Sequence, residues 1–278
     1  MKSDSRSDRT SIPPRPLPFV LAASEQGTLI VNRLDYRMTS ATSGYGVGHQ
    51  ILNTARCEGE EVNFAVQMLA MLREIRGNGV IALDCGANIG VHCIEWSRHM
   101  TGWGAVTAFE AQERIYYALA GNIALNNCFN ARAVHAALSD SDGEIAMPRP
   151  DYTQPGSFGS LEIRPGPKVE NIGQAISYRP EDLQNVRALR IDSLALGRAD
   201  FIKIDVEGME ISVLRGAEET IRRCRPIMLI EFVKSDRAQL EEFFRRHSYT
   251  FLYSGVNVLA MHEDDPVLPG VRIVGGDA

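Results

Sequence analysis

Acidic side chains follow short apolar runs at several points in this sequence of 278 residues. The runs are "VIALDC", "AVTAFE", "FIKIDV" and "PIMLIEFV". The carboxylates at or just beyond their ends are Asp84, Glu110, Asp205, Glu207 and Glu231. In such positions carboxylates can accept hydrogen bonds from sugar hydroxyls, attract a cationic ligand, remove a proton from a reacting group or bind a metal ion. These five residues are therefore the first candidates for a binding or catalytic site.

The loop "DCGANIG" indicates which ligand to expect after the first run. Gly86 and Gly90 let the backbone turn sharply and approach a ligand, and a helix expected from Asn88 offers free N–H groups. The spacing is G-x-x-x-G rather than the G-x-G-x-x-G of dinucleotide enzymes, and the charge of Asp84 would repel a pyrophosphate. An ammonium group would instead be attracted to Asp84, directly or through water. S-adenosylmethionine carries an ammonium and a sulfonium but no phosphate, and it is the expected cofactor.

Two further acids suit the remaining parts of such a cofactor. Glu110 lies 20 residues after Gly90, where a carboxylate can accept hydrogen bonds from both hydroxyls of a ribose. Enzymes that use NAD have the same device, so Glu110 alone does not separate the two cofactors. Asp140 in "ALSD" is placed to accept from an adenine amino group, although "SDSDG" is also a good turn sequence.

The segment "KIDVEG" places Lys203, Asp205 and Glu207 at period-two spacing, so an extended strand would point all three to one side. Two mechanisms are open for the acids. Asp205 or Glu207 could act as a general base, with a pKa raised by burial and by the neighbouring like charge. Alternatively, Asp205, Glu207 and Glu231 could bind Mg²⁺, which would lower the pKa of a substrate hydroxyl. Lys203 is expected to form a salt bridge to Asp205 or Glu207.

A glycine-punctuated loop, "SGYGVG" at 43–48, precedes a further candidate base. His49 follows this loop, which could fold over the cofactor, and Tyr45 within the loop could close the site. A lone loop histidine is more often solvated, so Asp205 and Glu207 are the stronger candidates. His92, His99 and His247 are expected to be structural.

From Val80 onward, short apolar runs alternate with helical stretches, which is the pattern of βαβ units and a parallel sheet. Strands are expected at 80–85, 105–110, 132–138, 201–206 and 226–233. A helix is expected at about 88–100. Three further helices are expected where residues at helical spacing would form one buried face, namely Ile115, Leu119 and Ile123; Ile211, Leu214, Ala217 and Ile221; and Leu240, Phe243, Phe244 and His247. The runs "YTFLYS" and "NVLAMH" on either side of Gly255 and Val256 predict a tight hairpin. An α/β fold with a terminal antiparallel hairpin differs from the ordinary dinucleotide-binding folds.

Three segments are expected along the chain. Residues 1–18 are rich in Ser, Arg, Asp and Pro and are expected to be a disordered arm. Residues 19–79 form an N-terminal cap segment with a strand at 28–31 and a helix whose buried face is Val62, Ala65, Val66, Leu69 and Leu72. Residues 80–278 form the cofactor-binding domain. Its stretch 140–190, rich in proline and glycine, is expected to be an excursion of turns and small strands beside the substrate site.

Composition excludes several classes of partner. A net charge of −6 and a pI near 5.6 give no basic field for nucleic acid or an anionic membrane. The five cysteines contain no C-x-x-C pair, which is typical of reduced thiols rather than a disulfide framework or a zinc site. No apolar run approaches the roughly 20 residues needed to cross a bilayer, and no signal-peptide core is seen. We therefore expect a cytoplasmic protein that acts on a small molecule.

Several motifs carry a family resemblance: "VIALDCGANIGVHCIEWS", "AFEAQERIYYALAGNIALNN", "AALSDSDGEI", "RIDSL" and "DFIKIDVEGMEISVLRGAEETIRRCRPIMLIEF". In this order, over about 80–233, they resemble the FkbM-type family of class I S-adenosylmethionine-dependent methyltransferases. The resemblance implies a seven-stranded sheet with a reversed terminal hairpin. It also implies methyl transfer to a hydroxyl, commonly on a sugar or a secondary metabolite. One departure is "FEAQ" at 109–112, where family members usually have a proline; it alters the loop but keeps Glu110.

Two other functions stay open. A nicotinamide-dependent oxidoreductase is disfavoured by the absent G-x-G-x-x-G and by Asp84. A catalytically silent module that only recognises a partner is disfavoured because Asp84, Glu110 and Asp205 are all retained. The sequence does not identify the acceptor, and N-methylation remains open although no "NPPY"-type loop follows the fourth strand.

Overall fold

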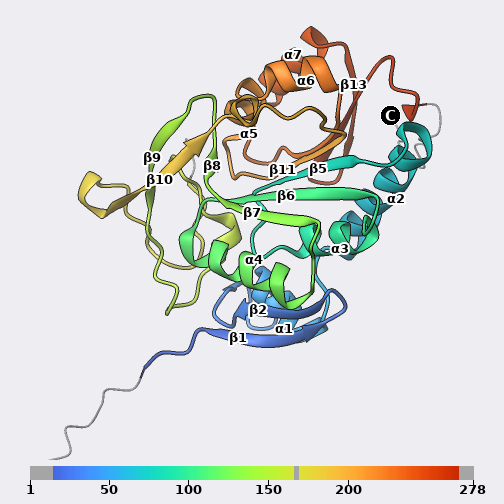
Figure 1. Ribbon diagram of the computed structural model, residues 1–278. Coiled ribbons are helices and arrows are strands. Elements are labelled where there is room, and N and C mark those ends of the chain that lie inside the picture. The colour runs from blue at the N-terminus through green and yellow to red at the C-terminus, as the bar shows by residue number, and fades with distance from the viewer. Residues whose placement is uncertain (1–14, 166–168, 269–278) are drawn as a thin grey trace, which may run out of the picture.

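The computed structural model describes residues 15–165 and 169–268 (Figure 1). Its centre is a seven-stranded sheet of order β13-β14-β12-β11-β5-β6-β7. The five parallel strands are β5 (Val80–Cys85), β6 (Gly104–Glu110), β7 (Ala131–His135), β11 (Phe201–Ile204) and β12 (Ile227–Glu231). The central ones are mostly apolar because helices cover both faces, with Asp84 in β5 and Lys203 in β11 as charged exceptions. The predicted mostly parallel sheet is confirmed.

The reversed end of the sheet is the hairpin of β13 (Tyr249–Ser254) and β14 (Asn257–His262). Strand β14 inserts antiparallel beside β12, and β13 forms the edge. Gly255 turns the chain between them with a φ of 58°, a conformation that glycine adopts at little steric cost. The predicted terminal hairpin is therefore confirmed.

Helices cover both faces of the sheet (Figure 1). On one face lie α2 (Gly59–Arg76), α3 (Val91–His99) and α4 (Glu113–Leu125), and on the other lie α5 (Glu210–Arg215), α6 (Glu218–Cys224) and α7 (Arg237–Arg246). Successive residues of β5 alternate between these layers: Ala82 packs in the core with α2 and α3, and Leu83 packs in the core with α5 to α7. Because successive side chains of a strand point to opposite faces, β5 contributes residues to two separate cores.

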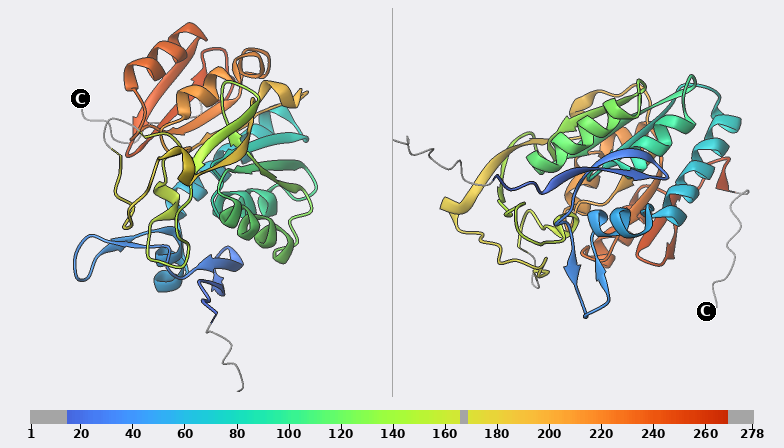
Figure 2. Two further views of the ribbon diagram at one scale, coloured as in Figure 1. Left: turned by 90° about the vertical axis from the view of Figure 1, so that its left-hand side faces the viewer. Right: turned by 90° about the horizontal axis from the view of Figure 1, so that it is seen from below.

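The N-terminal residues pack under α4. Strands β1 (Phe19–Ser24) and β2 (Gly27–Asn32) form a hairpin that lies across this helix (Figure 2, right). The side chain of Asn122 on α4 accepts from the Ile30 N–H at 2.5 Å and donates to the Ile30 carbonyl at 3.2 Å. Strands β3 (Arg37–Met38) and β4 (Gly44–Tyr45) and helix α1 (Val47–Thr54) follow. Of the arm predicted over 1–18, residues 1–14 lie outside the described residues.

The stretch 140–190 contains most of a second, three-stranded sheet of order β8-β10-β9. Its strands are β8 (Ala137–Leu138), β9 (Gly143–Pro148) and β10 (Leu183–Leu189), and the 3₁₀ turns η1 (Phe158–Ser160) and η2 (Pro180–Asp182) lie between β9 and β10; η3 (Asp192–Leu194) follows β10. The carboxylate of Asp35 joins this stretch to the N-terminal segment, because it accepts from the N–H groups of Gly48 and Phe158, both at 3.0 Å.

Several predicted boundaries are wrong. The third strand, expected at 132–138, ends at His135, and the chain then enters the second sheet as β8. The first helix begins at Val91 rather than Asn88, because Asn88 and Gly90 have left-handed φ values of 50° and 95°. The stripe expected at 211–221 is divided between α5 and α6.

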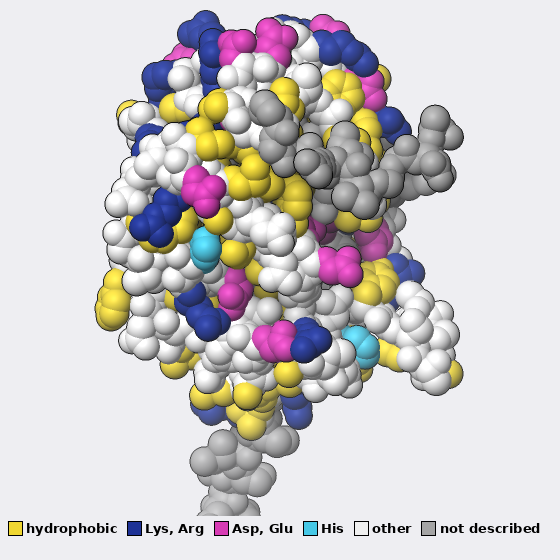
Figure 3. All heavy atoms as spheres, turned by 90° about the vertical axis from the view of Figure 1, so that its right-hand side faces the viewer, with side chains coloured by type: hydrophobic (Ala, Val, Ile, Leu, Met, Phe, Trp, Pro, Cys, Tyr) yellow, Lys and Arg dark blue, Asp and Glu magenta, His cyan; other side chains and the backbone are white. Residues whose placement is uncertain are grey.

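Within the described residues, no helix combines the length and the apolar character needed to cross a bilayer. On the face drawn in Figure 3, Lys and Arg side chains are interspersed with Asp and Glu, and neither sign dominates.

Candidate functional site

A cavity of about 280 Å³ lies at the carboxyl ends of the parallel strands. Its lining comes from the ends of β5, β6, β11 and β12, from the N-terminal segment around Tyr45 and Glu58, and from the 140–190 stretch around Gly159. In open α/β sheets this crevice is where ligands bind. The size is near the lower end of the ~300–1,000 Å³ of small-molecule sites.

The loop after β5 forms the floor of the cavity through Gly86, Ala87 and Asn88. Gly86 has a φ of 84°, and a Cβ placed on it would lie 1.7 Å from the Asp205 carbonyl oxygen. Position 86 therefore requires glycine because two strand-end loops touch here. This requirement is separate from any need for a ligand to approach the backbone. Gly90 is the residue before α3 and packs against Leu119 on α4, outside the cavity lining formed by the described residues.

Glu110 ends β6 and faces the cavity with only 7% of its surface exposed. One carboxylate oxygen accepts from the Asn88 N–H at 3.0 Å and the other from the Gln112 N–H at 2.7 Å. Burial raises the pKa of Glu110 to about 7, and these hydrogen bonds oppose the rise. Because each carboxylate oxygen can accept two hydrogen bonds, both keep capacity for ligand hydroxyls.

Asp84 lies beneath the loop rather than in the cavity lining. It is 0% exposed, and neither carboxylate oxygen has a hydrogen-bond partner among the described residues. Burial raises the pKa of Asp84, although Lys203 and His92 act in the opposite direction. A direct contact between Asp84 and a ligand in the cavity is therefore not supported.

Two other predicted residues lie away from the cavity. His49 is on α1, where its Nδ1 is 3.1 Å from the Asn53 amide nitrogen, although its neighbours Val47 and Gln50 line the cavity. Asp140 is exposed, and the nearby residues that do line the cavity are Ala136, Ala137 and Leu138.

The predicted catalytic acids Asp205, Glu207 and Glu231 all line the cavity, and one oxygen of each lies within 4.8 Å of the others. Strand β11 ends at Ile204, two residues earlier than predicted, and Glu207 adopts a left-handed φ of 55°. The loop therefore bends, yet it still directs both of its acids into the cavity. Burial, followed by the charge of Asp205, raises the pKa of Glu207 to about 8 and that of Glu231 to about 7.

Two lysines neutralise part of this acidic group. The Lys203 ammonium is 2.9 Å from Asp205 Oδ2, which confirms the predicted salt bridge. The Lys234 ammonium is 2.5 Å from Glu207 Oε2 and 2.9 Å from Glu170 Oε2. Glu231 has no hydrogen bond or ion pair within the part of the chain that the structure describes, so it is the acid that remains available.

Tyr45 lines the cavity and connects three segments. Its hydroxyl accepts from Arg37 Nη1 at 2.9 Å and donates to Glu170 Oε1 at 2.5 Å. Because Glu170 also pairs with Lys234, the N-terminal segment, the 140–190 stretch and the loop after β12 meet at this end of the cavity. Tyr45 thus lies at the cavity, where a residue that could close the site is expected.

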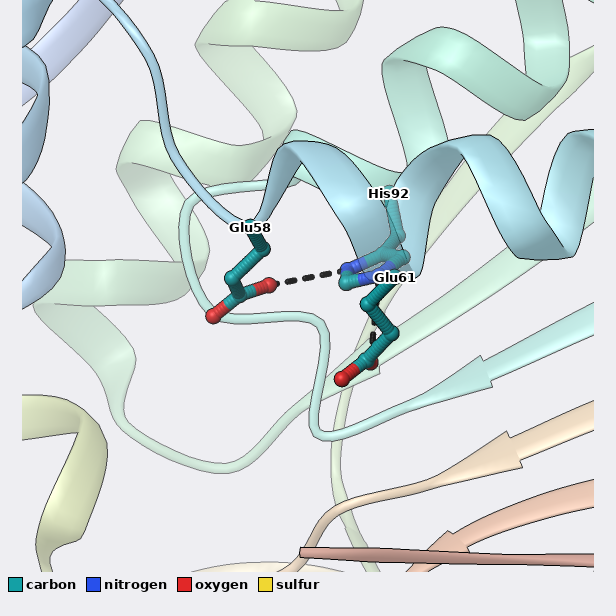
Figure 4. A group of neighbouring side chains, drawn as sticks. All are labelled: Glu58, Glu61 and His92. Carbon is teal, nitrogen blue, oxygen red and sulfur yellow. Dashed lines mark ion pairs between the residues drawn. The ribbon is translucent and has the colours of Figure 1, made fainter. Parts of the chain in front are cut away.

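A second group of charged side chains consists of Glu58, Glu61 and His92 (Figure 4), and the Lys203 ammonium lies 3.9 Å from Glu61 Oε1. His92, on α3, faces one carboxylate with each ring nitrogen: Nδ1 is 3.2 Å from Glu58 Oε2, and Nε2 is 3.2 Å from Glu61 Oε1. The second contact is at ion-pair distance without good hydrogen-bond alignment. Burial by itself would lower the pKa of His92, but the two carboxylates outweigh it and raise the pKa to about 9. His92 therefore joins α3 to the start of α2, in line with the structural role predicted for it.

Comparison with known proteins places the chain in a family. A family model described as the methyltransferase FkbM domain matches residues 84–251, which is more than half of the chain. The chain belongs to the FkbM methyltransferase family. The predicted resemblance is thereby confirmed, and the seven-stranded sheet with its reversed hairpin is the fold expected of such a domain.

Individual relatives of this FkbM domain are distant. It is similar to methyltransferase sdnD of Sordaria araneosa, with 28% identity over 160 residues that cover 49% of this chain and 60% of the relative. Among solved structures it is similar to methyltransferase FkbM from Methylobacillus flagellatus KT, with 17% identity, a TM-score of 0.47, and coverage of 66% of this chain and 44% of that one. A precorrin-6y C5,15-methyltransferase from Geobacter metallireducens GS-15 shows 13% identity, a TM-score of 0.43, and coverage of 75% and 90%. The match to sdnD thus spans less than two-thirds of the length of that protein.

Sequence reasoning missed several residues of the FkbM site, namely Glu58, Gln112, Glu170 and Lys234. Lys234 directly follows a predicted strand, so its position at a strand end was a usable signal. Glu58 stands in the acidic run "EGEE", where nothing in the local pattern separates it from its exposed neighbour Glu60.

Proposed function

We propose that this chain is an S-adenosylmethionine-dependent methyltransferase that O-methylates a hydroxyl of a small-molecule acceptor, such as a sugar or a secondary metabolite. The proposal rests mainly on one observation: a single cavity holds Glu110 at the end of β6 and the acids Asp205, Glu207 and Glu231 at the ends of β11 and β12. The first suits the ribose of a donor, and the second suits the removal of a proton from an acceptor. Family membership supports the methyl-transfer chemistry.

The residues present fit the proposed donor. Glu110 is fixed by two backbone N–H groups and offers its remaining acceptor positions to a ribose diol. Gly86 and Asn88 form a floor without a cradle for phosphates. Bound S-adenosylmethionine would supply an electrophilic methyl group on its sulfonium. The work of the chain is then to orient the acceptor and to exclude water.

We assign proton removal to Glu231. An alcohol is a weak nucleophile at neutral pH, so a base must take its proton as the oxygen–carbon bond forms and the carbon–sulfur bond breaks. Asp205 and Glu207 are each paired with an ammonium, whereas Glu231 is not. A pKa of about 7 suits a base that works near neutrality.

The Mg²⁺ alternative fits these residues less well. A divalent ion bound by Asp205, Glu207 and Glu231 would have to displace Lys203 from the first and Lys234 from the second. The two ammonium groups already supply positive charge beside these carboxylates. We therefore propose methyl transfer without a bound metal, and expect turnover to persist after dialysis against a chelator.

The thiols support a reducing location. All five cysteines are free, and four of them are buried. We propose that the protein works in the cytoplasm, where thiols stay reduced. Fractionation of cells that express the chain, followed by immunoblotting, tests this.

Calorimetry and product analysis test the function itself. Titration with S-adenosylhomocysteine is expected to give saturable binding, while NAD is expected to give none. Incubation with methyl-labelled donor and a panel of hydroxylated small molecules is then expected to yield a labelled ether. Clean binding of NAD without binding of the methyl donor or its product would overturn the proposal in favour of an oxidoreductase. Binding of neither cofactor would favour a silent module.

A further inference from the structure

Glu58 contributes a carboxylate to the cavity from outside the strand-end loops. It directly precedes α2, and 38% of its side chain is exposed. The cavity lining includes Glu58 together with Gly86, His92 and Lys203. A carboxylate therefore faces the floor loop from the N-terminal side, at the place where Asp84 is buried underneath.

The contact with His92 holds Glu58 ionised and oriented (Figure 4). Burial raises the pKa of the Glu58 carboxyl, but the hydrogen bond from His92 together with the charges of His92 and Lys203 outweighs it and lowers the pKa below its ordinary value. His92 is itself buried, so it cannot turn away to solvent. Glu58 thus presents a fixed negative charge, which lowers the entropic cost of binding a cation.

The same group is poorly suited to a metal ion. A metal ion binds a neutral imidazole through one nitrogen, whereas here each ring nitrogen faces a different carboxylate. The Lys203 ammonium also lies 3.9 Å from Glu61 Oε1, where it would repel a cation bound by that oxygen. The arrangement is that of an imidazolium held between two acids.

The charge around Glu58 favours an added cation. Three carboxylates, Glu58, Glu61 and Asp205, stand against the two cations His92 and Lys203 in this connected group. The balance is −3 + 2 = −1 before the buried Asp84 is counted. An organic ammonium ion would bring the group to neutrality in a partly buried cavity, where such pairing is effective.

The position of Glu58 also suits the geometry of the proposed donor. Glu110 marks the ribose end of the cavity, and Asn88 connects Glu110 to the floor loop through its N–H. Glu58 and Lys203 also line the cavity, and Lys203 pairs in the sheet with Asp84, two residues before Gly86. An elongated ligand with its ribose at Glu110 would extend its amino-acid tail along this floor.

We propose that Glu58 binds the ammonium group of the amino-acid tail of S-adenosylmethionine, with His92 as the residue that positions it. This inference rests on the proposed function, because it assigns part of the donor to a residue. It gives the first 79 residues a direct part in cofactor binding. It also replaces the direct role expected for Asp84 with a role for a residue 26 positions earlier.

A pair of ligands isolates the ammonium group. S-adenosylhomocysteine is compared with its deamino analogue, adenosylthiobutanoate, which keeps the carboxylate and lacks the ammonium. Calorimetry on the full chain is expected to show that the wild type binds S-adenosylhomocysteine about 10-fold more tightly, as for a charge-assisted hydrogen bond. Glu58→Gln is expected to reduce this preference to less than about 2-fold. Glu60→Gln, the same change at an exposed position on the first turn of α2, is expected to retain it.

The outcomes separate the inference from the proposed function. If the wild type binds neither adenosyl ligand, the proposed function fails and the inference with it. If the wild type discriminates between the ligands and Glu58→Gln keeps that preference, the inference alone fails. Equal weakening of both ligands by Glu58→Gln would also overturn it, because the residue would then have only a structural role. His92→Gln is expected to reduce the preference partially, which tests the positioning role.

Discussion

At the scale of single residues, the site separates into acids that differ in their partners. Glu110 is held by backbone N–H groups, Asp205 and Glu207 are paired with lysines, and Glu231 has no ion pair or hydrogen bond among the described residues. Four carboxylates that look equivalent in the sequence thus have different surroundings. Two predictions follow from this division.

Glu231→Gln removes the proposed base. We expect turnover to fall about 100-fold, since general base catalysis contributes roughly 10²–10⁴. Binding of S-adenosylhomocysteine should stay within about 2-fold of wild type, because the substitution conserves shape and lies away from Glu110. Steady-state kinetics with methyl-labelled donor and calorimetry measure the two effects. Glu263→Gln, on the exposed surface, is the control. Wild-type turnover in the Glu231 variant would contradict the assignment.

Glu110→Gln is expected to affect cofactor binding, in contrast to Glu231→Gln. The amide has one acceptor oxygen instead of two, and its nitrogen would face the Asn88 or Gln112 N–H. We expect binding of S-adenosylhomocysteine to weaken about 10-fold or more, since hydrogen bonds to charged groups contribute about 1.5–3 kcal/mol. Calorimetry measures this directly. Glu113→Gln, whose wild-type side chain bonds Tyr117 instead, should bind as the wild type does. Equal affinities for the two variants would exclude the ribose role.

At the scale of elements, the site depends on two loops that touch. The loop after β5 and the loop after β11 meet where Gly86 packs against the Asp205 carbonyl. This contact sets the distance between the floor of the cavity and the acidic group. The left-handed φ of Glu207, 55°, then directs its side chain toward Lys234.

Gly86→Ala tests this contact. Its Cβ would lie 1.7 Å from a backbone oxygen and the φ of 84° is strained for alanine, so we expect a loss of more than about 3 kcal/mol of unfolding free energy. Gly102→Ala is a matched control, because Gly102 has a similar φ of 80° with no atom within 4 Å of the added Cβ. Its cost should be only the conformational penalty of about 1–2 kcal/mol. Urea denaturation measures both, and equal losses would show that the loop contact is unimportant.

At the scale of the whole molecule, charged contacts connect the N-terminal segment to the sheet. His92 links α3 to the start of α2, and Asp35 links the N-terminal segment to the 140–190 stretch. Glu58 and His92 line the cavity, as do Val47 and Ser157, which adjoin the two residues bound by Asp35. Stability and ligand binding are therefore expected to be coupled.

The His92 contacts predict a pH dependence of stability. The pKa of His92 is about 9 in the folded protein against an ordinary value of 6.5, so the folded state binds the proton more tightly. The stabilisation is complete below about pH 6.5 and is lost as the pH rises through about 9. We expect the unfolding free energy to fall by on the order of 2 kcal/mol over this window.

Urea denaturation at a series of pH values measures this fall. His92→Gln should make the fall smaller and leave the part that comes from Glu207, whose raised pKa of about 8 acts in the same direction. His99→Gln should leave it in place, because partial burial lowers the pKa of His99 and its effect lies below pH 6.5. A pH profile of the wild type that is flat between 6.5 and 9 would contradict the proposed ion pairing.

Local pattern alone was sufficient to locate the five parallel strands, the reversed hairpin, the glycine loop and the positions of Glu110, Asp205 and Glu231. It did not give the strand ends at His135 and Ile204. Burial on both faces makes a parallel strand apolar throughout, and parallel strands bring their carboxyl ends to one edge, so acids that follow such runs must meet. The lysine paired with Asp205 was also predictable, because two positions along an extended strand point the same way.

Docking between distant segments decided the rest. Whether Asp84 or Glu58 faces the cavity depends on how α2 packs against α3. The sequence pattern within either helix does not predict that contact. The pairing of Lys234 with Glu207 needs a loop bent through a left-handed residue, where the period of a strand no longer applies. Periodicity describes regular backbone only, so the side chains that neutralise, orient or expose each acid emerged from tertiary packing.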